Sequence, residues 1–279
     1  VNFFDTADAY NLGESERIIG ETLMGYASRE NIVLSTKVGL RMGAGVNQIG
    51  LGRKHLMESI DKQLKRLKTD YIDLYQIHRL DNITPLEEVL DTLTEIRKAG
   101  KILYIGCSTM PAYKFAQLLT LAECKGYARP IAMQNLYNLI QRDEEREMIP
   151  LCVDAGVGLI PYSPLARGVL AGNRVGGGVG ETERAKYDKG LKTGASLFRD
   201  SDKEVVATVI SIAKKYDIKP TQVALSWILK NPAVVSPIIG ATKLSHISDA
   251  ISAVDIELSM DDMKDLERPY QSRESPLNI

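Results

Sequence analysis

Short apolar runs and segments with helical periodicity alternate along almost the whole of this 279-residue chain. Apolar residues at Leu56, Ile60, Leu64 and Leu67 predict a helix over 54–68, while NIVLSTK and IDLYQIH are typical of strands. The full pattern predicts strands at 1–5, 31–37, 72–78, 102–108, 131–135, 157–163 and 237–241, and helices at 14–25, 54–68, 85–98, 111–124, 143–155, 202–216, 221–229, 245–254 and 260–267. Strands that are apolar almost throughout indicate a parallel sheet covered by helices, which leaves a doubly wound sheet or a (β/α)8 barrel.

The number of strand–helix units bears on where the fold begins. A barrel of roughly 250 residues divides into eight units of about 31 residues, and the pattern here contains seven. We therefore expect residues 1–279 to form a single α/β barrel domain that lacks its first strand, with an N-terminal segment ahead of Val1 in the natural protein. The segment 165–200 has no periodicity and contains Gly176, Gly177 and Gly178, so it is predicted to be a long loop.

Composition excludes several classes of partner and location. The 35 basic and 36 acidic side chains give a net charge of −1, which argues against nucleic acid or an anionic membrane as the main partner. No apolar run approaches the roughly 20 residues of a membrane span, and the first ten residues carry Asp5 and Asp8 rather than a basic signal-peptide region. Cys107, Cys124 and Cys152 lack metal-site spacing, so we expect a cytoplasmic protein with neither disulfides nor a metal.

Polar residues stand where the predicted strands end. Asp5, Lys37 and His78 end three successive strands, and Tyr10 follows Asp5 by five residues. In a barrel, the carboxyl ends of the strands share the rim at which catalysis takes place. Each residue taken alone is more often a cap, a turn residue or a solvated side chain, so the indication of a site comes from the set.

This set suits the reduction of a carbonyl by hydride transfer. The developing alkoxide needs a proton donor, and a tyrosine phenol, with an ordinary pKa near 10, is a weak one at neutral pH. A lysine ammonium beside the phenol stabilises the phenolate, and a carboxylate keeps that ammonium charged and in place. A histidine beside the carbonyl oxygen orients it and donates a hydrogen bond.

The segments FFDTADAYNLGESERIIG, NIVLSTKVG, DYIDLYQIHRLD, GCS, MQNLYN and IPYSPLARGVL resemble the aldo-keto reductases, in order and from Val1 to about Glu267. The resemblance is strongest to the branch related to the potassium-channel β subunits. It implies a (β/α)8 barrel that binds NADP(H) in an extended form without a Rossmann fingerprint. No GxGxxG motif follows a strand here, in keeping with that expectation.

The resemblance also assigns residues. Asp5, Tyr10, Lys37 and His78 match the family's catalytic tetrad, with Tyr10 as the general acid. The matched cofactor-binding residues are Ser108 and Gln134 for the nicotinamide carboxamide, Tyr162 for stacking on the nicotinamide, Ser163, Leu165 and Arg167 for the pyrophosphate, and Gly240, Thr242, Lys243, His246 and Asp249 around the adenosine phosphates. Thr109 stands where the family commonly has Asn. At the positions of His246 and Asp249 related sequences often have Arg or Gln, and Glu.

The resulting hypothesis is an NADPH-dependent reductase of aldehydes or ketones, with a small carbonyl compound as its partner. The alternative is a regulatory subunit that senses redox state through bound NADP and turns over slowly, since such subunits keep the same tetrad. An inactive fragment is a third possibility, because the first strand is missing. The resemblance implies that the loops after the strands set the substrate, here 40–53, 136–141, 165–200 and the tail 268–279. Their sequences do not identify the substrate, and the oligomeric state stays open.

Overall fold

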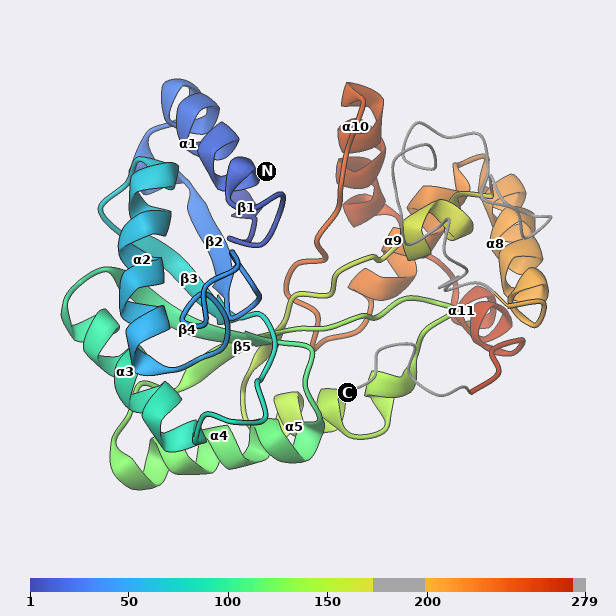
Figure 1. Cartoon of the computed structure of the whole chain (residues 1–279). Coiled ribbons are helices and arrows are strands. Elements are labelled where there is room, and N and C mark those ends of the chain that lie inside the picture. The colour runs from blue at the N-terminus through green and yellow to red at the C-terminus, as the bar shows by residue number, and fades with distance from the viewer. Residues whose placement is uncertain (173–198, 273–279) are drawn as a thin grey trace. The chain divides into compact units, whose positions relative to one another are not determined.

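The computed structural model describes residues 1–172 and 199–272 and divides the chain into two compact units. Unit 1 consists of Val1–Gln134 and Leu151–Val157, and unit 2 of Asn135–Pro150 and Gly158–Ile279. Figure 1 colours the chain from blue in unit 1 to red at the end of unit 2. The predicted glycine-rich segment Gly176–Gly178 and the last residues of the 268–279 tail lie outside the described residues.

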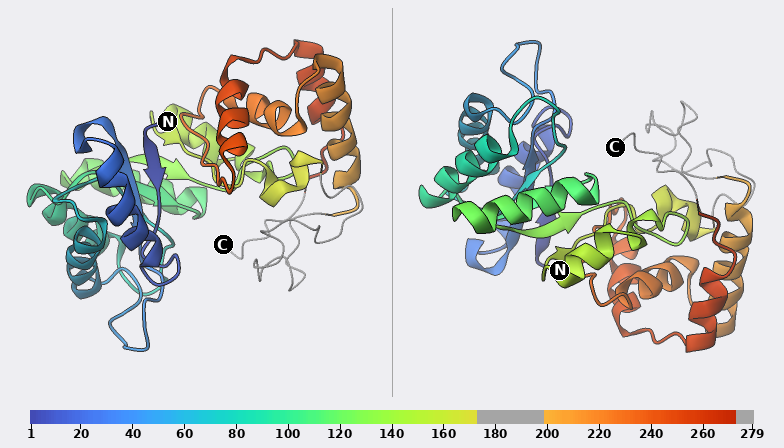
Figure 2. Two further views of the ribbon diagram at one scale, coloured as in Figure 1. Left: turned by 90° about the horizontal axis from the view of Figure 1, so that it is seen from above. Right: turned by 90° about the horizontal axis from the view of Figure 1, so that it is seen from below.

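Unit 1 is built from five parallel strands that are neighbours in chain order. The strands are β1 (Phe3–Asp5), β2 (Val33–Val38), β3 (Ile72–Ile77), β4 (Ile102–Ser108) and β5 (Pro130–Gln134). Between them lie the helices α1 (Glu14–Tyr26), α2 (Arg53–Leu67), α3 (Leu86–Lys98) and α4 (Ala112–Lys125). Figure 1 shows these helices along one face of the strands, and the two views in Figure 2 agree. The predicted alternation is confirmed here, with bounds within two residues.

The helices of unit 1 form where the sequence places one apolar side. In α2, Leu56, Ile60 and Leu67 are completely buried, as their spacing predicts. Gly126 has φ of 70° and ends α4 in the left-handed conformation that glycine adopts most easily. Pro85 stands directly before α3, where its missing N–H leaves no unpaired donor.

The strands of unit 1 carry polar side chains on both faces. Thr36 and Tyr75 hydrogen-bond to residues of α1 and α2, so these side chains lie on the helix-covered face. Because side chains alternate along a strand, Ser35, Lys37 and Gln76 lie on the opposite face. That opposite face also receives the carboxylate of Asp5, to which Ser35 and Gln76 both donate.

The sheet of unit 1 is strongly curved. Gln134 at the end of β5 donates from Nε2 to Asp5 Oδ1 on β1 at 3.0 Å. On a flat sheet, strands four places apart would be separated by roughly 19 Å, at about 4.8 Å per strand, and a glutamine and an aspartate cannot span that distance. The Asp5 face is therefore concave, which is the curvature that a parallel barrel requires.

Within its described residues, unit 2 contains helices, 3₁₀ segments and one short strand. They are a 3₁₀ turn (Asp143–Glu145), β6 (Gly158–Leu159), a 3₁₀ segment (Ala166–Ala171), α8 (Asp202–Tyr216), α9 (Pro220–Leu229), α10 (Leu244–Ser252), a 3₁₀ turn (Ala253–Asp255) and α11 (Met260–Glu267). The helix α5 (Met148–Asp154) begins in unit 2 and ends in unit 1. The predicted helices 202–216, 221–229, 245–254 and 260–267 are confirmed.

Three predictions differ from the structure. The helix predicted over 143–155 is divided into a 3₁₀ turn and α5, because Pro150 cannot lie in a helix interior but fits a first turn. Of the strand predicted over 157–163, only β6 forms, and the strand predicted over 237–241 does not form. Instead Leu159 and Tyr162 form single parallel bridges to Val234 and Ile238. Pro161, Pro164 and Pro237 lack the N–H that a continuous ladder needs.

Candidate active site

Lys37 and Asp5 form a buried ion pair at the carboxyl ends of β2 and β1. Lys37 Nζ lies 2.5 Å from Asp5 Oδ2, and the two side chains are 1% and 5% exposed. The ammonium also donates to the backbone oxygen of Thr6 at 2.8 Å. A buried lysine needs such partners because removing an ammonium from water is costly. The pair therefore fixes a positive charge at a defined point of the concave face.

The second oxygen of Asp5 accepts three hydrogen bonds from neutral side chains. Ser35 Oγ and Gln76 Nε2 donate to Oδ1 at 3.1 Å each, and Gln134 Nε2 donates at 3.0 Å. Gln76 Nε2 also lies 2.7 Å from Ser35 Oγ. Side chains from three other strands, β2, β3 and β5, thus hold one carboxylate of β1, which explains how it stays in place with so little solvent around it.

Tyr10 and His78 complete the predicted tetrad. Lys37 Nζ donates to Tyr10 Oη at 3.3 Å, and the rings of Tyr10 and His78 lie edge to face with centroids 5.7 Å apart. Tyr10 is 42% exposed, so its hydroxyl can meet a molecule arriving from solvent. The structure brings all four predicted residues together, and their catalytic roles remain predictions.

His78 is held in its neutral form. Burial, as the largest cause, and the charges of Lys37 and Arg79 together lower the pKa of its imidazole to about 3. Its Nδ1 is buried, with no hydrogen-bond partner among the residues that the structure describes. A neutral imidazole carries one N–H donor and one acceptor, so near neutral pH this ring can donate a hydrogen bond without bringing a second positive charge.

A polar network on the helix-covered face supports Lys37 from behind. Glu16 of α1 is fully buried and accepts from Thr36 Oγ1 at 2.6 Å and from Arg66 Nε at 2.7 Å. Gln63 of α2 bridges Glu16 and the backbone oxygen of Lys37 at 2.9 and 3.0 Å. The sequence did not predict this network. The available signal was the spacing of Glu16 with Gly20 and Leu23, which places Glu16 on the inward stripe of α1.

Asp8 lies beside this network without a clear partner. It is 1% exposed, its backbone N–H donates to Lys37 O at 3.2 Å, and neither carboxylate oxygen has a hydrogen-bond partner of normal geometry in the described part of the chain. The pKa of Asp8 rises from 3.8 to about 7, first because of burial and second because of the charge of Glu16. Arg66, Lys37 and the Ala9 amide offset only part of this rise.

The two residues predicted to hold the nicotinamide in unit 1 end adjacent strands. Ser108 and Gln134 are register partners at the ends of β4 and β5, and both are buried. Ser108 Oγ lies 3.3 Å from Thr109 Oγ1 and 3.5 Å from Arg79 Nη1. Gln134 uses its amide N–H on Asp5, a contact that the sequence did not predict.

In unit 2, one set of predicted cofactor residues follows β6. Tyr162 donates its backbone N–H to Asn135 O at 2.9 Å. Ser163, Ala166 and Arg167 have φ values of 54°, 47° and 56°. A backbone in this left-handed conformation can turn consecutive N–H groups to one side, which is how protein loops hold anions. Leu165 stands within the same loop.

The other set in unit 2 surrounds the start of α10. Lys243 precedes the first residue of this helix, Gly240, Thr242, Lys243 and His246 are exposed, and Thr242 N–H lies 3.4 Å from His246 Nδ1. A helix start and an exposed ammonium are both favourable to phosphate. Asp249 is already engaged, since Lys219 Nζ contacts its two oxygens at 2.7 and 2.8 Å.

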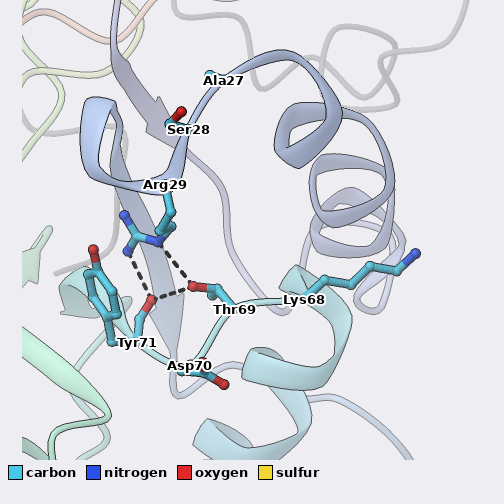
Figure 3. Close-up of a pocket in the computed structure, with 7 residues that line it drawn as sticks. All are labelled: Ala27, Ser28, Arg29, Lys68, Thr69, Asp70 and Tyr71. Carbon is cyan, nitrogen blue, oxygen red and sulfur yellow. Dashed lines mark hydrogen bonds between the residues drawn. The ribbon is translucent and has the colours of Figure 1, made fainter.

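A pocket in unit 1 lies away from the tetrad, beside the amino-terminal ends of β2 and β3 (Figure 3). Arg29 fills one side of it and donates to Thr69, to Tyr71 O and to Asp73 at 3.0, 2.9 and 2.5 Å. Asp73 also accepts from Leu34 N–H at 2.9 Å. These bonds give Asp73 a structural role as a hydrogen-bond acceptor. The bonds that Arg29 donates occupy its guanidinium, so it has little capacity left to bind a ligand in this pocket.

Within the described residues, no helix has the length and hydrophobicity to span a bilayer, and no three His, Cys, Asp or Glu side chains are grouped as metal ligands.

Comparison with known proteins gives one consistent result. The family model described as the aldo/keto reductase family matches residues 1–270. The versiconal hemiacetal acetate reductase of Aspergillus parasiticus is 38% identical over 97% of this chain and 83% of the relative. Putative aryl-alcohol dehydrogenases of Schizosaccharomyces pombe and Saccharomyces cerevisiae are 40% and 35% identical, over 97% and 96% of this chain and 81% and 82% of those proteins.

Proposed function

Because the chain belongs to the aldo/keto reductase family, we propose that it reduces aldehydes or ketones to alcohols with NADPH, using Tyr10 as the general acid. The names of its relatives, reductases and aryl-alcohol dehydrogenases, support oxidoreductase chemistry on carbonyl and alcohol groups. The single observation that carries the proposal is the buried Lys37 ammonium, held between the Asp5 carboxylate and the Tyr10 hydroxyl.

The roles of these side chains follow from their positions. NADPH, when bound, supplies the hydride. Tyr10 gives its hydroxyl proton to the oxygen of the substrate as negative charge develops there. The Lys37 ammonium at 3.3 Å stabilises the resulting phenolate, and Asp5 keeps the ammonium charged and in position. The neutral His78, edge to face with Tyr10, donates an N–H bond to the same oxygen.

The residues present fit a dinucleotide phosphate chemically. In unit 2 the left-handed loop, the start of α10 and the exposed ammonium of Lys243 are all suited to anions. The family generally uses NAD(P)H, and we propose NADP(H) because Lys243 can meet a 2′-phosphate. We keep the predicted cofactor residues as part of this proposal: Ser108, Gln134, Tyr162, Ser163, Leu165, Arg167, Gly240, Thr242, Lys243, His246 and Asp249.

Fold and location follow the same reasoning. The fold of this family is the (β/α)8 barrel, and the concave sheet of unit 1 supports it. We propose that residues 1–279 belong to one domain of this fold. A cytoplasmic location remains a prediction, as does the branch of the potassium-channel β subunits. The relatives with reductase and dehydrogenase names do not favour the alternative of a slow redox-sensing subunit.

The proposal is tested by turnover. Purified protein is assayed with NADPH and a panel of aliphatic and aromatic aldehydes and ketones, alongside Tyr10→Phe and the control Tyr26→Phe, whose ring is 90% exposed at the end of α1. We expect Tyr10→Phe to lose roughly 10²–10⁴-fold in rate while binding NADPH as before, and Tyr26→Phe to match the wild type. A Tyr10→Phe rate within a few fold of wild type would refute the assignment.

A further inference from the structure

We propose that Gln76 and Ser35 act together as positioning residues that hold Asp5, and through Asp5 the ammonium of Lys37, in the arrangement that proton transfer requires. This inference rests on the proposed function, since it assigns a role in the same reaction. Gln76 Nε2 lies 2.7 Å from Ser35 Oγ and 3.1 Å from Asp5 Oδ1, and Ser35 Oγ lies 3.1 Å from the same oxygen. The three groups form a closed triangle of hydrogen bonds.

The positions of the pair in the strands support this role. Ser35 lies two residues before Lys37 on β2, and Gln76 lies two residues before His78 at the end of β3. Residues two apart in a strand share a face. Ser35 and Gln76 therefore share the concave face with the proposed catalytic side chains, and in the register of the sheet Ser35 is the partner of Asp5 and Gln76 the partner of Lys37.

The neighbouring strand leaves room for the long side chain of Gln76. Gly106 of β4 is its register partner. A Cβ atom at position 106 would lie 3.0 Å from Gln76 Cγ and 3.1 Å from Leu74 Cδ1, closer than most real Cβ contacts. The lack of a side chain at Gly106 thus gives Gln76 the space in which it reaches toward β1.

The third donor to Asp5 Oδ1 has another task in the proposed function. Gln134 is assigned to the nicotinamide, so its amide group is shared between Asp5 and a ligand. The Ser35–Gln76 pair is fully buried. Gln76 also lies deeper in the sheet than Gln134, because its register partner Gly106 comes two residues before Ser108, the partner of Gln134. The pair supplies the part of Asp5's hydrogen bonding that remains the same whether or not a cofactor is bound. Without the pair, Asp5 Oδ1 keeps only the bond from Gln134, so the carboxylate holds Lys37 less firmly at its distance from Tyr10.

The experiment compares Gln76→Met, Gln76→Glu and Ser35→Ala with the control Ser59→Ala, a buried serine of α2 that contacts His55. We expect Gln76→Met to lower kcat roughly tenfold or more, which matches the loss of a hydrogen bond to a charged group, with KM values within about twofold of wild type. Ser35→Ala should show a smaller loss of the same kind, and Ser59→Ala none.

The conservative variant separates positioning from packing. In Gln76→Glu a protonated carboxyl can donate to Asp5, but an ionised one has no proton to donate and repels the Asp5 carboxylate. Burial beside a carboxylate raises the pKa of the introduced carboxyl group. The activity of Gln76→Glu should therefore approach wild type near pH 5 and fall to the level of Gln76→Met near about pH 9. The same pH profile in wild type and Gln76→Glu, or full activity in Gln76→Met, would overturn the proposal.

A readout that needs no turnover tests the contact itself. Urea unfolding of Gln76→Met, Asp5→Asn and the double variant gives the coupling between the two side chains. We expect a coupling of at least about tenfold in the unfolding constant, and additivity of the two changes would overturn the proposal. If the wild type reduces no carbonyl in the panel, the proposed function fails, while this cycle still decides whether Gln76 holds Asp5. If Gln76→Met does not fold, Ser35→Ala in the same cycle gives the decision.

Discussion

Replacing Asp8 by asparagine should stabilise this protein, and by an amount that depends on pH. The carboxyl group is 1% exposed and its pKa is raised from 3.8 to about 7, first by burial and then by Glu16. Each tenfold change in proton affinity is worth about 1.4 kcal/mol. A rise of this size therefore corresponds to about 4 kcal/mol of folding free energy that is lost when the group must ionise. Relaxation around the charge lowers the expected value to about 1–4 kcal/mol.

The sign of the effect follows from proton binding. Because the folded state binds the Asp8 proton more tightly than the unfolded state, the contribution is most favourable below about pH 4. It weakens as the pH rises toward 7 and is constant above that. Asparagine has nearly the same shape and no charge. Asp8→Asn should thus equal the wild type near pH 4 and exceed it near pH 8.

The measurement is urea unfolding followed by circular dichroism at about pH 4, 6 and 8, with Asp70→Asn as the control. Asp70 is exposed, and its replacement should change the unfolding free energy little at any of these values. The reasoning is refuted if the Asp8→Asn difference is the same at every pH. It is equally refuted if this variant is the less stable protein near pH 8.

Two further predictions address one residue in each unit, Lys243 in unit 2 and Asp73 in unit 1. Lys243→Ala should raise the dissociation constant for NADPH, with a loss that shrinks as salt increases, and leave that for NADH almost unchanged. Equal losses for both cofactors in a fluorescence titration would mean that Lys243 does not contact the 2′-phosphate. Asp73→Ala should cost about 1–3 kcal/mol of unfolding free energy, because Arg29 and Leu34 N–H lose their acceptor. The exposed neighbour Lys68 provides the matched control, and an Asp73→Ala value no larger than that of Lys68→Ala would contradict the structural role.

The sequence predicted most of unit 1 because its signals are local. Apolar runs and helical stripes gave β2 to β5 and α1 to α4 almost to the residue. The failures in unit 2 come from non-local competition. The segment 157–163 has an apolar composition, but Pro161 and the left-handed Ser163 restrict it to the short β6 and to isolated bridges. The bridge partners Val234 and Ile238 lie roughly 75 residues away along the chain.

The site shows the same division. Motif and position along the strands were sufficient to bring Asp5, Tyr10, Lys37 and His78 together. The contacts that hold them could not be predicted, because they depend on which side chains meet across the curved sheet. In the sequence, nothing distinguishes Gln76 from other polar residues of a strand. Its proposed role follows only from its distances to Ser35 and Asp5.

The bond between Gln134 and Asp5 also has a consequence in time. These residues are 129 positions apart, so at about 5–20 residues per second a ribosome adds Gln134 on the order of ten seconds after Asp5. During that interval the nascent chain can pair β1 with β2 but lacks one donor to the carboxylate. A contact of such long sequence separation also forms slowly during refolding, because a large loop must close first. Asp5 therefore acquires its full set of hydrogen bonds only after β5 has been synthesised and the sheet has curved.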